Sequence, residues 1–324
     1  MSDSTSGHDT PQAGRLLIGL YPARYRAAHG EDIQATFAEA VEGRPRHAVL
    51  RECRDLATHA LRLRLRIGPT DAPGRLLAGA APVALALAAG CALSYLLPQL
   101  HELVHRIRYP YPNLGLGYAV LNAVLAVAST MPWLLALAFA VSGRWQAARA
   151  TGAAAVLLGA GALALLAPAS YVRGEIAWMT LVGLLALLAP AGLVDVAQRG
   201  RWEMAALALA VALPMIAVGR YGAQYLPMPM EGLLPIWLST VTAPVLAVRL
   251  SGGRSDRLRE LGVGLGVLPW LMPIVIAALY GAVPLPTVLR YTGACLAPLG
   301  GAAAVAGAVQ LARRARTADP SDPV

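Results

Sequence analysis

The sequence predicts an all-α polytopic membrane protein, in which a small N-terminal cytoplasmic domain of helices precedes a bundle of about eight transmembrane helices. Three observations lead to this fold class. Of the 324 residues, 57% are hydrophobic and 14% are charged, whereas soluble domains carry about a quarter charged residues. Long apolar runs follow one another from residue 76 to residue 312. The arginines gather between these runs and in the N-terminal region, which is the placement that orients membrane proteins.

Changes in composition divide the chain into five parts. Residues 1–14 are polar and are expected to be disordered. Residues 15–67 are predicted to form a cytoplasmic domain of amphipathic helices, and residues 68–75 are a linker of turn-forming residues. The transmembrane domain covers residues 76–312, and residues 313–324 form a tail that is also expected on the cytoplasmic side.

Three helices are predicted in the N-terminal domain. Pro22 suits the first turn of the first helix and Gly30 suits its end. The second helix is expected over 31–42 and the third over 46–66, with a break at Gly43 and Pro45 between them. Each of the last two has apolar residues on one face. These faces comprise Ile33, Phe37, Ala40 and Val41, then Val49, Leu50, Cys53, Leu56, Ala57, Ala60 and Leu61.

The third helix also carries a set of arginines that lie largely off its apolar face. They are Arg46, Arg51, Arg54, Arg62 and Arg66. Arginines in this arrangement favour contact with anionic lipid headgroups or with a protein partner. A solvated helix face explains the same pattern equally well.

The apolar runs set the number of transmembrane helices. A span needs about 20 apolar residues, and the third and fifth runs are short by this measure. The prediction is therefore eight spans, with an uncertainty of about one. The runs cover residues 76–98, 117–141, 151–168, 176–197, 204–219, 233–250, 261–280 and 291–312.

Two local features of the runs bear on their packing. Gly262 and Gly266 have the small-xxx-small spacing that allows two membrane helices to approach closely. Prolines inside runs remove helical hydrogen bonds and are expected to kink some of the helices. These prolines are Pro132, Pro214, Pro244, Pro269, Pro273 and Pro298.

The distribution of arginines predicts the orientation in the membrane. Ten arginines lie in alternate connections and in the tail, and four lie shortly before the first run, which gives fourteen on one side. Five lie on the opposite side, namely Arg106, Arg108, Arg173, Arg220 and Arg290. Because cytoplasmic loops carry the excess of Lys and Arg, both termini are expected in the cytoplasm of a multi-pass protein of the plasma membrane.

One motif points to metal chemistry, namely His101-Glu-Leu-Val-His105. On a helix the two histidines lie one turn apart and can bind Zn²⁺ together, while Glu102 between them can act as the general base on a metal-bound water. Glu175 and Glu231 lie in connections expected on the same side and are the candidate third ligands. The motif is therefore compatible with a membrane-embedded zinc metalloprotease.

Two residues weaken this zinc interpretation. Pro98 precedes the motif and puts its helical continuity in question. Arg106 follows at a position where such proteases usually have an uncharged residue. An interfacial loop that carries polar histidines is an alternative interpretation of the same motif. Zinc is the one cofactor that the sequence suggests, and a non-enzymatic membrane protein requires none.

Two further classes of function are disfavoured. Ionisable residues are almost absent from the runs, where Asp195 is the exception, and a secondary transporter usually needs more of them. The net charge of +9 suggests nucleic acid at first sight. The arginines, however, follow the membrane pattern, so no nucleic-acid partner is expected.

Residues 15–66 resemble the permease prefix domain, a short helical module that precedes the first span in macrolide-exporter-type ABC permeases and occurs in many actinobacterial membrane proteins. The matching residues are Leu20, Tyr21, Pro22, Arg24, Tyr25, Arg26, His29, Gly30, Glu31, Asp32, Phe37, Glu52, Asp55, Leu56, His59, Leu61, Arg62, Arg64 and Leu65. The resemblance covers about one sixth of the chain. It implies a cytoplasmic module with a link to transport. The remaining chain departs from those permeases, which resemble a four-span protein with a large outer domain.

These observations favour a non-enzymatic membrane protein whose cytoplasmic prefix docks a protein partner. It would be a transport-associated subunit or a membrane-bound regulator. The sequence contains no Walker motif, so active transport requires a separate ATPase. The expected partners are therefore the lipid bilayer and a cytoplasmic ATPase or regulatory protein.

Overall fold

The structure of the protein is a computed structural model in which every element is a helix within the residues that it describes. These residues are 16–109, 116–166, 169–194, 198–221, 230–252, 256–281 and 283–317. The all-α fold class is thereby confirmed. The chain forms two compact units, Met1–Gly74 and Arg75–Val324. The expected disordered segment 1–14 and most of the expected tail lie outside the described residues.

The first unit contains two long helices, α2 (Ala23–Val41) and α3 (Arg46–Arg64). The predicted break between them is confirmed. Gly43 has a φ of +66°, a conformation that glycine adopts without the steric cost that most other residues meet, and Pro45 is the N-cap of α3. The core of this unit is small, as expected from its length. It contains Ile18, Tyr21, Phe37, Val41, Ala60 and Ile67.

The predicted helix end at Gly30 is wrong, because α2 continues through this residue. A glycine inside a helix costs only about 1 kcal/mol relative to alanine. The burial of Phe37 and Val41 further along α2 offsets that cost. The predicted apolar face of α3 is also only partly correct, because Leu50 and Leu61 are exposed.

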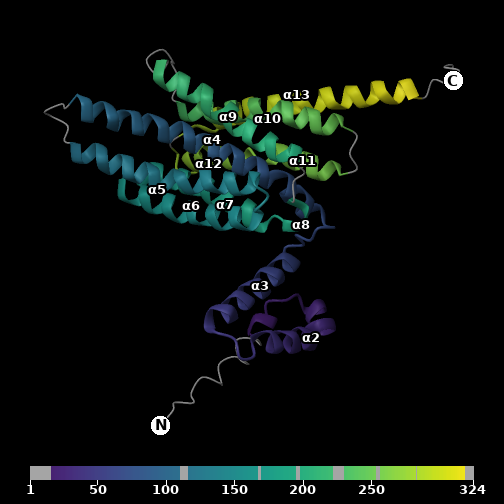
Figure 1. The fold of residues 1–324 in the computed structure, drawn as a ribbon. Coiled ribbons are helices and arrows are strands. Elements are labelled where there is room, and N and C mark those ends of the chain that lie inside the picture. Colours follow the sequence, from purple (N-terminus) through teal and green to yellow (C-terminus); the bar gives the residue numbers. More distant parts are fainter. Residues whose placement is uncertain are drawn as a thin grey trace, which may run out of the picture. The chain divides into compact units, whose positions relative to one another are not determined.

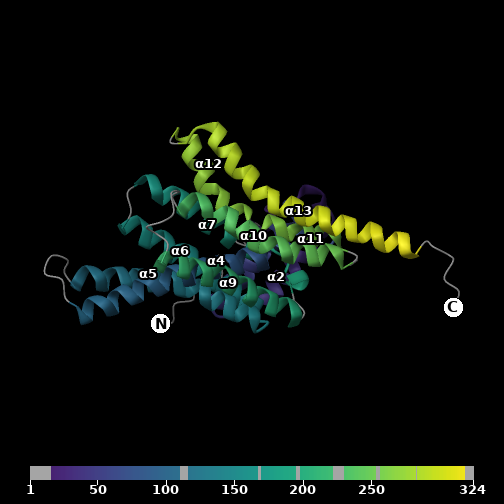
Figure 2. The same cartoon turned by 90° about the horizontal axis from the view of Figure 1, so that it is seen from above.

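The second unit is a bundle of apolar helices (Figures 1 and 2). Consecutive helices pack together, as α5 does with α6 and α6 with α7, and α10 packs against the more distant α13. In order, they are α4 (Ala72–Arg108), α5 (Leu116–Val141), α6 (Trp145–Leu166), α7 (Ala169–Leu188), α8 (Ala191–Val194), α9 (Gln198–Tyr221), α10 (Met230–Ser251), α11 (Arg257–Leu265), η1 (Leu268–Leu271), α12 (Met272–Leu279) and α13 (Leu285–Thr317).

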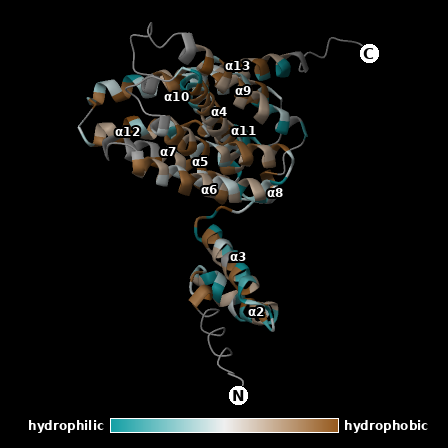
Figure 3. Cartoon of the chain, turned by 60° about the vertical axis from the view of Figure 1, so that its left-hand side comes forward, coloured by the Kyte–Doolittle hydropathy of each residue, from teal (hydrophilic) through white to brown (hydrophobic). Residues whose placement is uncertain are grey.

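Within the described residues, seven helical segments are long and apolar enough to cross a membrane, and a shorter apolar helix covers Ile176–Leu188. This agrees with the prediction of eight spans within one. The hydrophobic colouring of these helices contrasts with the mixed colouring of α2 and α3 (Figure 3). The chain is therefore a multi-pass membrane protein.

The lengths of several spans differ from those of the apolar runs. The third and fifth runs belong to helices of full length, because α6 and α9 begin before the apolar residues do. The helix that covers the fourth run ends earlier than expected. Helix α7 stops at Leu188, and α8 is a separate short helix. Pro190 accounts for this end, because a proline disfavours the helical conformation of the residue before it.

Helix α4 forms the centre of the second unit, and small residues allow other helices to reach it closely. A Cβ atom on Gly79 would overlap the carbonyl oxygen of Arg259 in α11. A Cβ atom on Gly90 would lie 2.7 Å from the carbonyl oxygen of Ala208 in α9. A Cβ atom on Gly262 would overlap the carbonyl oxygen of Leu76 in α4. The close helix contact predicted at Gly262 is thereby confirmed.

Prolines interrupt one span and leave the others continuous. Between Arg257 and Leu279 the helix is divided into α11, η1 and α12, and Pro269 and Pro273 lie in the first turns of η1 and α12. The other prolines named from the sequence lie inside continuous helices, where the membrane favours a helix over unpaired backbone groups. They are Pro132, Pro214, Pro244 and Pro298.

Candidate functional site

The two histidines predicted to bind zinc lie on one continuous helix. Helix α4 passes through Pro98 and ends at Arg108, so the motif lies on a helix and not in an interfacial loop. The ring centroids of His101 and His105 are 6.5 Å apart. The two histidines are therefore one turn apart on one helix, and their rings must turn toward each other to share one zinc ion.

The acid of the motif already has a cationic partner. The Nε atom of Arg106 donates to Oε1 of Glu102 over 2.6 Å, one helix turn apart. Helix α7 begins before Glu175 and α10 begins before Glu231, but the side chains of both glutamates lie outside the described residues. No group of three metal-ligating side chains occurs among the side chains that the structure describes.

The arginines predicted to contact lipid or partner lie on α3 or just beyond its end. Arg46, Arg51 and Arg66 are exposed, whereas Arg62 is half-buried. The side chain of Arg54 lies outside the described residues. The contact of these arginines with a partner or with lipid stays a prediction.

A groove of about 420 Å³ lies between α2 and α3 in the first unit. Its aromatic part is a stack in which Tyr21 and Tyr25 have ring centroids 5.5 Å apart and Tyr25 and His29 have centroids 4.8 Å apart. The hydroxyl of Tyr21 is 3.0 Å from Nδ1 of His59, which joins α3 to the stack. Burial raises the pKa of Tyr21 above its usual 10.0, and the neighbouring Tyr25 raises this pKa further.

Acidic side chains line the same groove. Asp32 comes from α2, and Glu52 and Asp55 come from α3. Arg44, in the turn between the two helices, lies 3.8 Å from Glu52. No arginine is among the described residues that line the groove. The groove therefore combines aromatic rings with carboxylates, a combination suited to a positively charged ligand.

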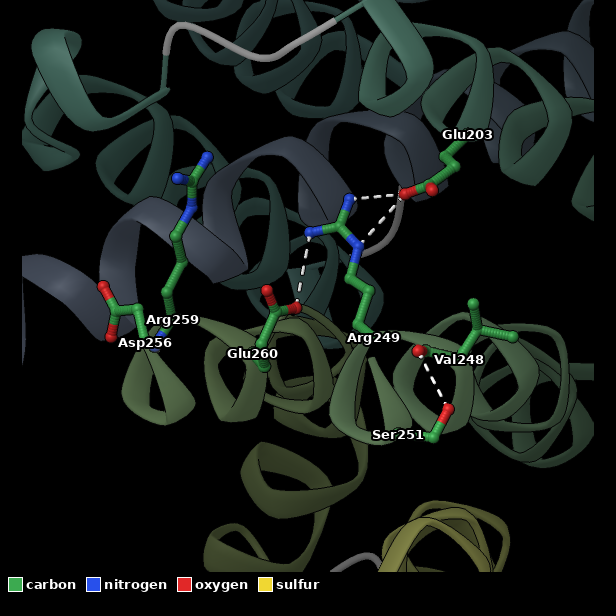
Figure 4. Close-up of polar contacts among 7 residues, drawn as sticks. All are labelled: Glu203, Val248, Arg249, Ser251, Asp256, Arg259 and Glu260. Carbon is green, nitrogen blue, oxygen red and sulfur yellow. Dashed lines mark hydrogen bonds and ion pairs between the residues drawn. The ribbon is translucent and has the colours of Figure 1, made fainter. Parts of the chain in front are cut away.

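The structure also contains a charged cluster in the second unit that the sequence interpretation missed (Figure 4). Nε and Nη2 of Arg249 donate to Oε2 of Glu203 over 3.1 and 2.7 Å. Nη1 of Arg249 lies 3.9 Å from Oε2 of Glu260. Arg249 lies in the last turn of α10, Glu203 belongs to the first turns of α9, and Glu260 belongs to the first turn of α11, so the cluster joins three helices.

This cluster corrects the expectation that ionisable residues are almost absent from the spans. Arg249 lies within the run 233–250, and Glu203 and Glu260 each immediately precede a run, which is the signal that sequence inspection could have used. Two carboxylates share one guanidinium, and Glu260 is only 6% exposed. Asp195, the exception noted in the sequence, lies outside the described residues.

Comparison with protein-family models, with curated proteins and with solved structures finds no match to this chain. The class of protein that the structure defines, on its apolar helices of span length, is the multi-pass helical membrane protein.

Proposed function

We propose that the chain is a membrane-bound adaptor of the plasma membrane, whose N-terminal unit docks a cytoplasmic protein. The observation that carries this proposal is the composition of the groove between α2 and α3. Nine of its twelve lining residues are among those that resemble the permease prefix domain, although they are scattered from residue 21 to residue 59. Two of the nine, Tyr21 and Phe37, belong to the core of the unit, whereas the other seven are at least partly exposed, and their gathering at one surface fits a shared binding role.

The chemistry of the groove specifies the docked segment. Asp32, Glu52 and Asp55 favour Lys or Arg, and the ring of Tyr25, which is only partly buried, adds cation–π attraction. A groove between two helices suits an amphipathic helix. The proposed occupant is therefore a basic amphipathic helix of the partner protein, with an apolar side chain directed at the aromatic stack. The excess of arginines on one side supports a cytoplasmic location for both termini and hence for this unit.

Charge reversal in the groove tests the proposal. Asp32→Lys combined with Asp55→Lys is expected to weaken partner binding about tenfold or more, because like charges then face the basic helix. Binding is measured by cross-linking from a photoreactive residue at Thr36, which lines the groove, followed by mass spectrometry of the captured peptide. The expected peptide is basic and helical.

A matched control separates the groove from overall charge. Glu39→Lys combined with Glu42→Lys makes the same change in charge on exposed residues at the end of α2, outside the groove. This pair is expected to leave capture unchanged. Equal loss in both pairs, or capture of this chain's own N-terminus, contradicts the proposal. An ATPase as the captured protein indicates a transport subunit, and a regulatory protein indicates a membrane-bound regulator.

A zinc metalloprotease is the second candidate, because α4 places His101 and His105 one turn apart. If this site binds zinc, the full-length protein purified without chelators is expected to retain equimolar zinc. His101→Ala and His105→Ala should each lose it, while Glu102→Gln keeps the metal but loses peptide hydrolysis. His47→Ala on α3 is the control for histidine content. Metal analysis that finds zinc-free protein in repeated preparations removes this candidate.

A further inference from the structure

The second unit contains an apolar cavity of about 520 Å³ that neither the partner-docking groove nor the zinc motif uses. Its lining comes from α4, α5, α6, α7, α9, α10 and η1, so it lies inside the membrane-spanning bundle. This volume lies in the range of small-molecule sites, about 300–1,000 Å³. Tyr95, which is half-exposed, is part of the lining, so the cavity reaches the outer surface of the bundle.

One wall of the cavity consists of three stacked tryptophans. The ring centroids of Trp133 and Trp178 are 6.3 Å apart with an interplanar angle of 29°, and those of Trp178 and Trp270 are 5.4 Å apart with an angle of 22°. Trp133 and Trp270 are each 2% exposed. Trp270 belongs to η1, the short helix within the interrupted span, and Pro269 lies in the first turn of η1. The three rings therefore form one apolar aromatic stack that is held by three separate elements.

The polar groups of the cavity define what kind of ligand fits. No Asp, Glu, Lys, Arg or His is among the described lining residues, so a charged ligand would lack a counter-charge. The hydroxyls of Ser94, Ser129 and Thr130 donate to carbonyl oxygens of their own helices. The Nε1 atom of Trp270 is buried and has no hydrogen-bond acceptor among the described residues. An unpaired buried donor costs about 1–3 kcal/mol, and a ligand with an acceptor would remove that cost.

We infer that this cavity binds a neutral, planar, membrane-soluble ring carrying a carbonyl acceptor, the chemistry of a quinone. The ring packs against the tryptophan stack in an edge-to-face or offset contact, and the carbonyl accepts from Nε1 of Trp270. An acyl chain of a lipid fills the same volume, but it presents neither a flat face nor an acceptor inside the cavity. The inference is independent of the function proposed for the first unit.

Two probes of the same shape test the inference on the full-length protein in lipid nanodiscs. Dimethylnaphthoquinone carries the carbonyls, and dimethylnaphthalene lacks them. Equilibrium gel filtration, with empty nanodiscs as the blank, measures the bound amount of each. The quinone is expected to bind saturably and about tenfold more tightly than the hydrocarbon, which corresponds to one hydrogen bond. Equal affinities, with displacement by palmitate, would identify a lipid chain as the occupant and overturn the inference.

Substitution of Trp270 locates the donor. Trp270→Phe keeps an aromatic ring and removes the N–H, so it is expected to lower quinone affinity to the level of the hydrocarbon and to leave hydrocarbon affinity unchanged. The control is Trp202→Phe, because Trp202 is exposed and does not line the cavity. Unchanged quinone affinity in Trp270→Phe overturns the inference. If that variant fails to fold, the two-probe comparison on the unaltered protein still decides it.

Discussion

Replacing Arg249 by methionine is expected to lower the free energy of unfolding of the second unit by about 3 kcal/mol. Methionine keeps the apolar length of the side chain but removes the guanidinium that Glu203 and Glu260 share. Both carboxylates then lose the guanidinium that they share, and Oε2 of the buried Glu260 already lacks a hydrogen bond within the described residues. The midpoint of unfolding in detergent, compared with the unaltered protein, measures the loss.

Rescue variants show whether the loss comes from uncompensated charge. Arg249→Met combined with Glu203→Gln and Glu260→Gln removes the charges along with the cation, so most of the stability should return. Arg249→Lys is expected to lie between the two, because an ammonium cannot reproduce the two N–H groups that contact Glu203. A single Arg249→Met variant that unfolds like the unaltered protein would show that the cluster contributes nothing to stability.

The sequence predicted the helices well because their signals are local. Apolar runs of span length and arginine-rich connections are properties of short segments. The predicted ends of the helices were less accurate, because they also depend on the surroundings of each helix. Gly30 and Pro98 are helix breakers in isolation, yet α2 and α4 continue through them. Burial of Phe37 and Val41 maintains α2, whereas α4 is maintained because a break inside the membrane would leave more backbone groups unpaired.

The candidate sites divide in the same way. The spacing of His101 and His105 is a property of one helix, so the sequence sufficed to predict it. The cluster around Arg249 joins three helices, and the tryptophan wall joins α5, α7 and η1. Such groups depend on how the helices pack together, which no local pattern reports. The groove between α2 and α3 was predicted in part. The resemblance to the permease prefix domain marked most of its residues but did not show that they face one another.

Gly262→Ala is expected to destabilise the bundle by about 3 kcal/mol, although alanine is the better helix former in water. The added Cβ atom would overlap the carbonyl oxygen of Leu76. This obstacle is backbone, which cannot rotate away as a side chain would. The overlap must therefore separate α4 from α11 along the contact where Gly79 also approaches Arg259. The midpoint of unfolding in detergent and the yield of folded protein both report the effect.

Gly264→Ala is the matched control, two residues further along the same helix. A Cβ atom there would lie 3.6 Å from Cδ2 of Leu246 and 3.9 Å from Cδ1 of Leu299, which are ordinary contacts. This variant should be neutral or slightly stabilising, because alanine is favoured over glycine in a helix. If the two variants behave alike, glycine content rather than close approach governs this segment, and the contact between α4 and α11 is looser than the structure shows. A loss confined to Gly262→Ala instead means that the absence of this one side chain sets the distance between the two helices.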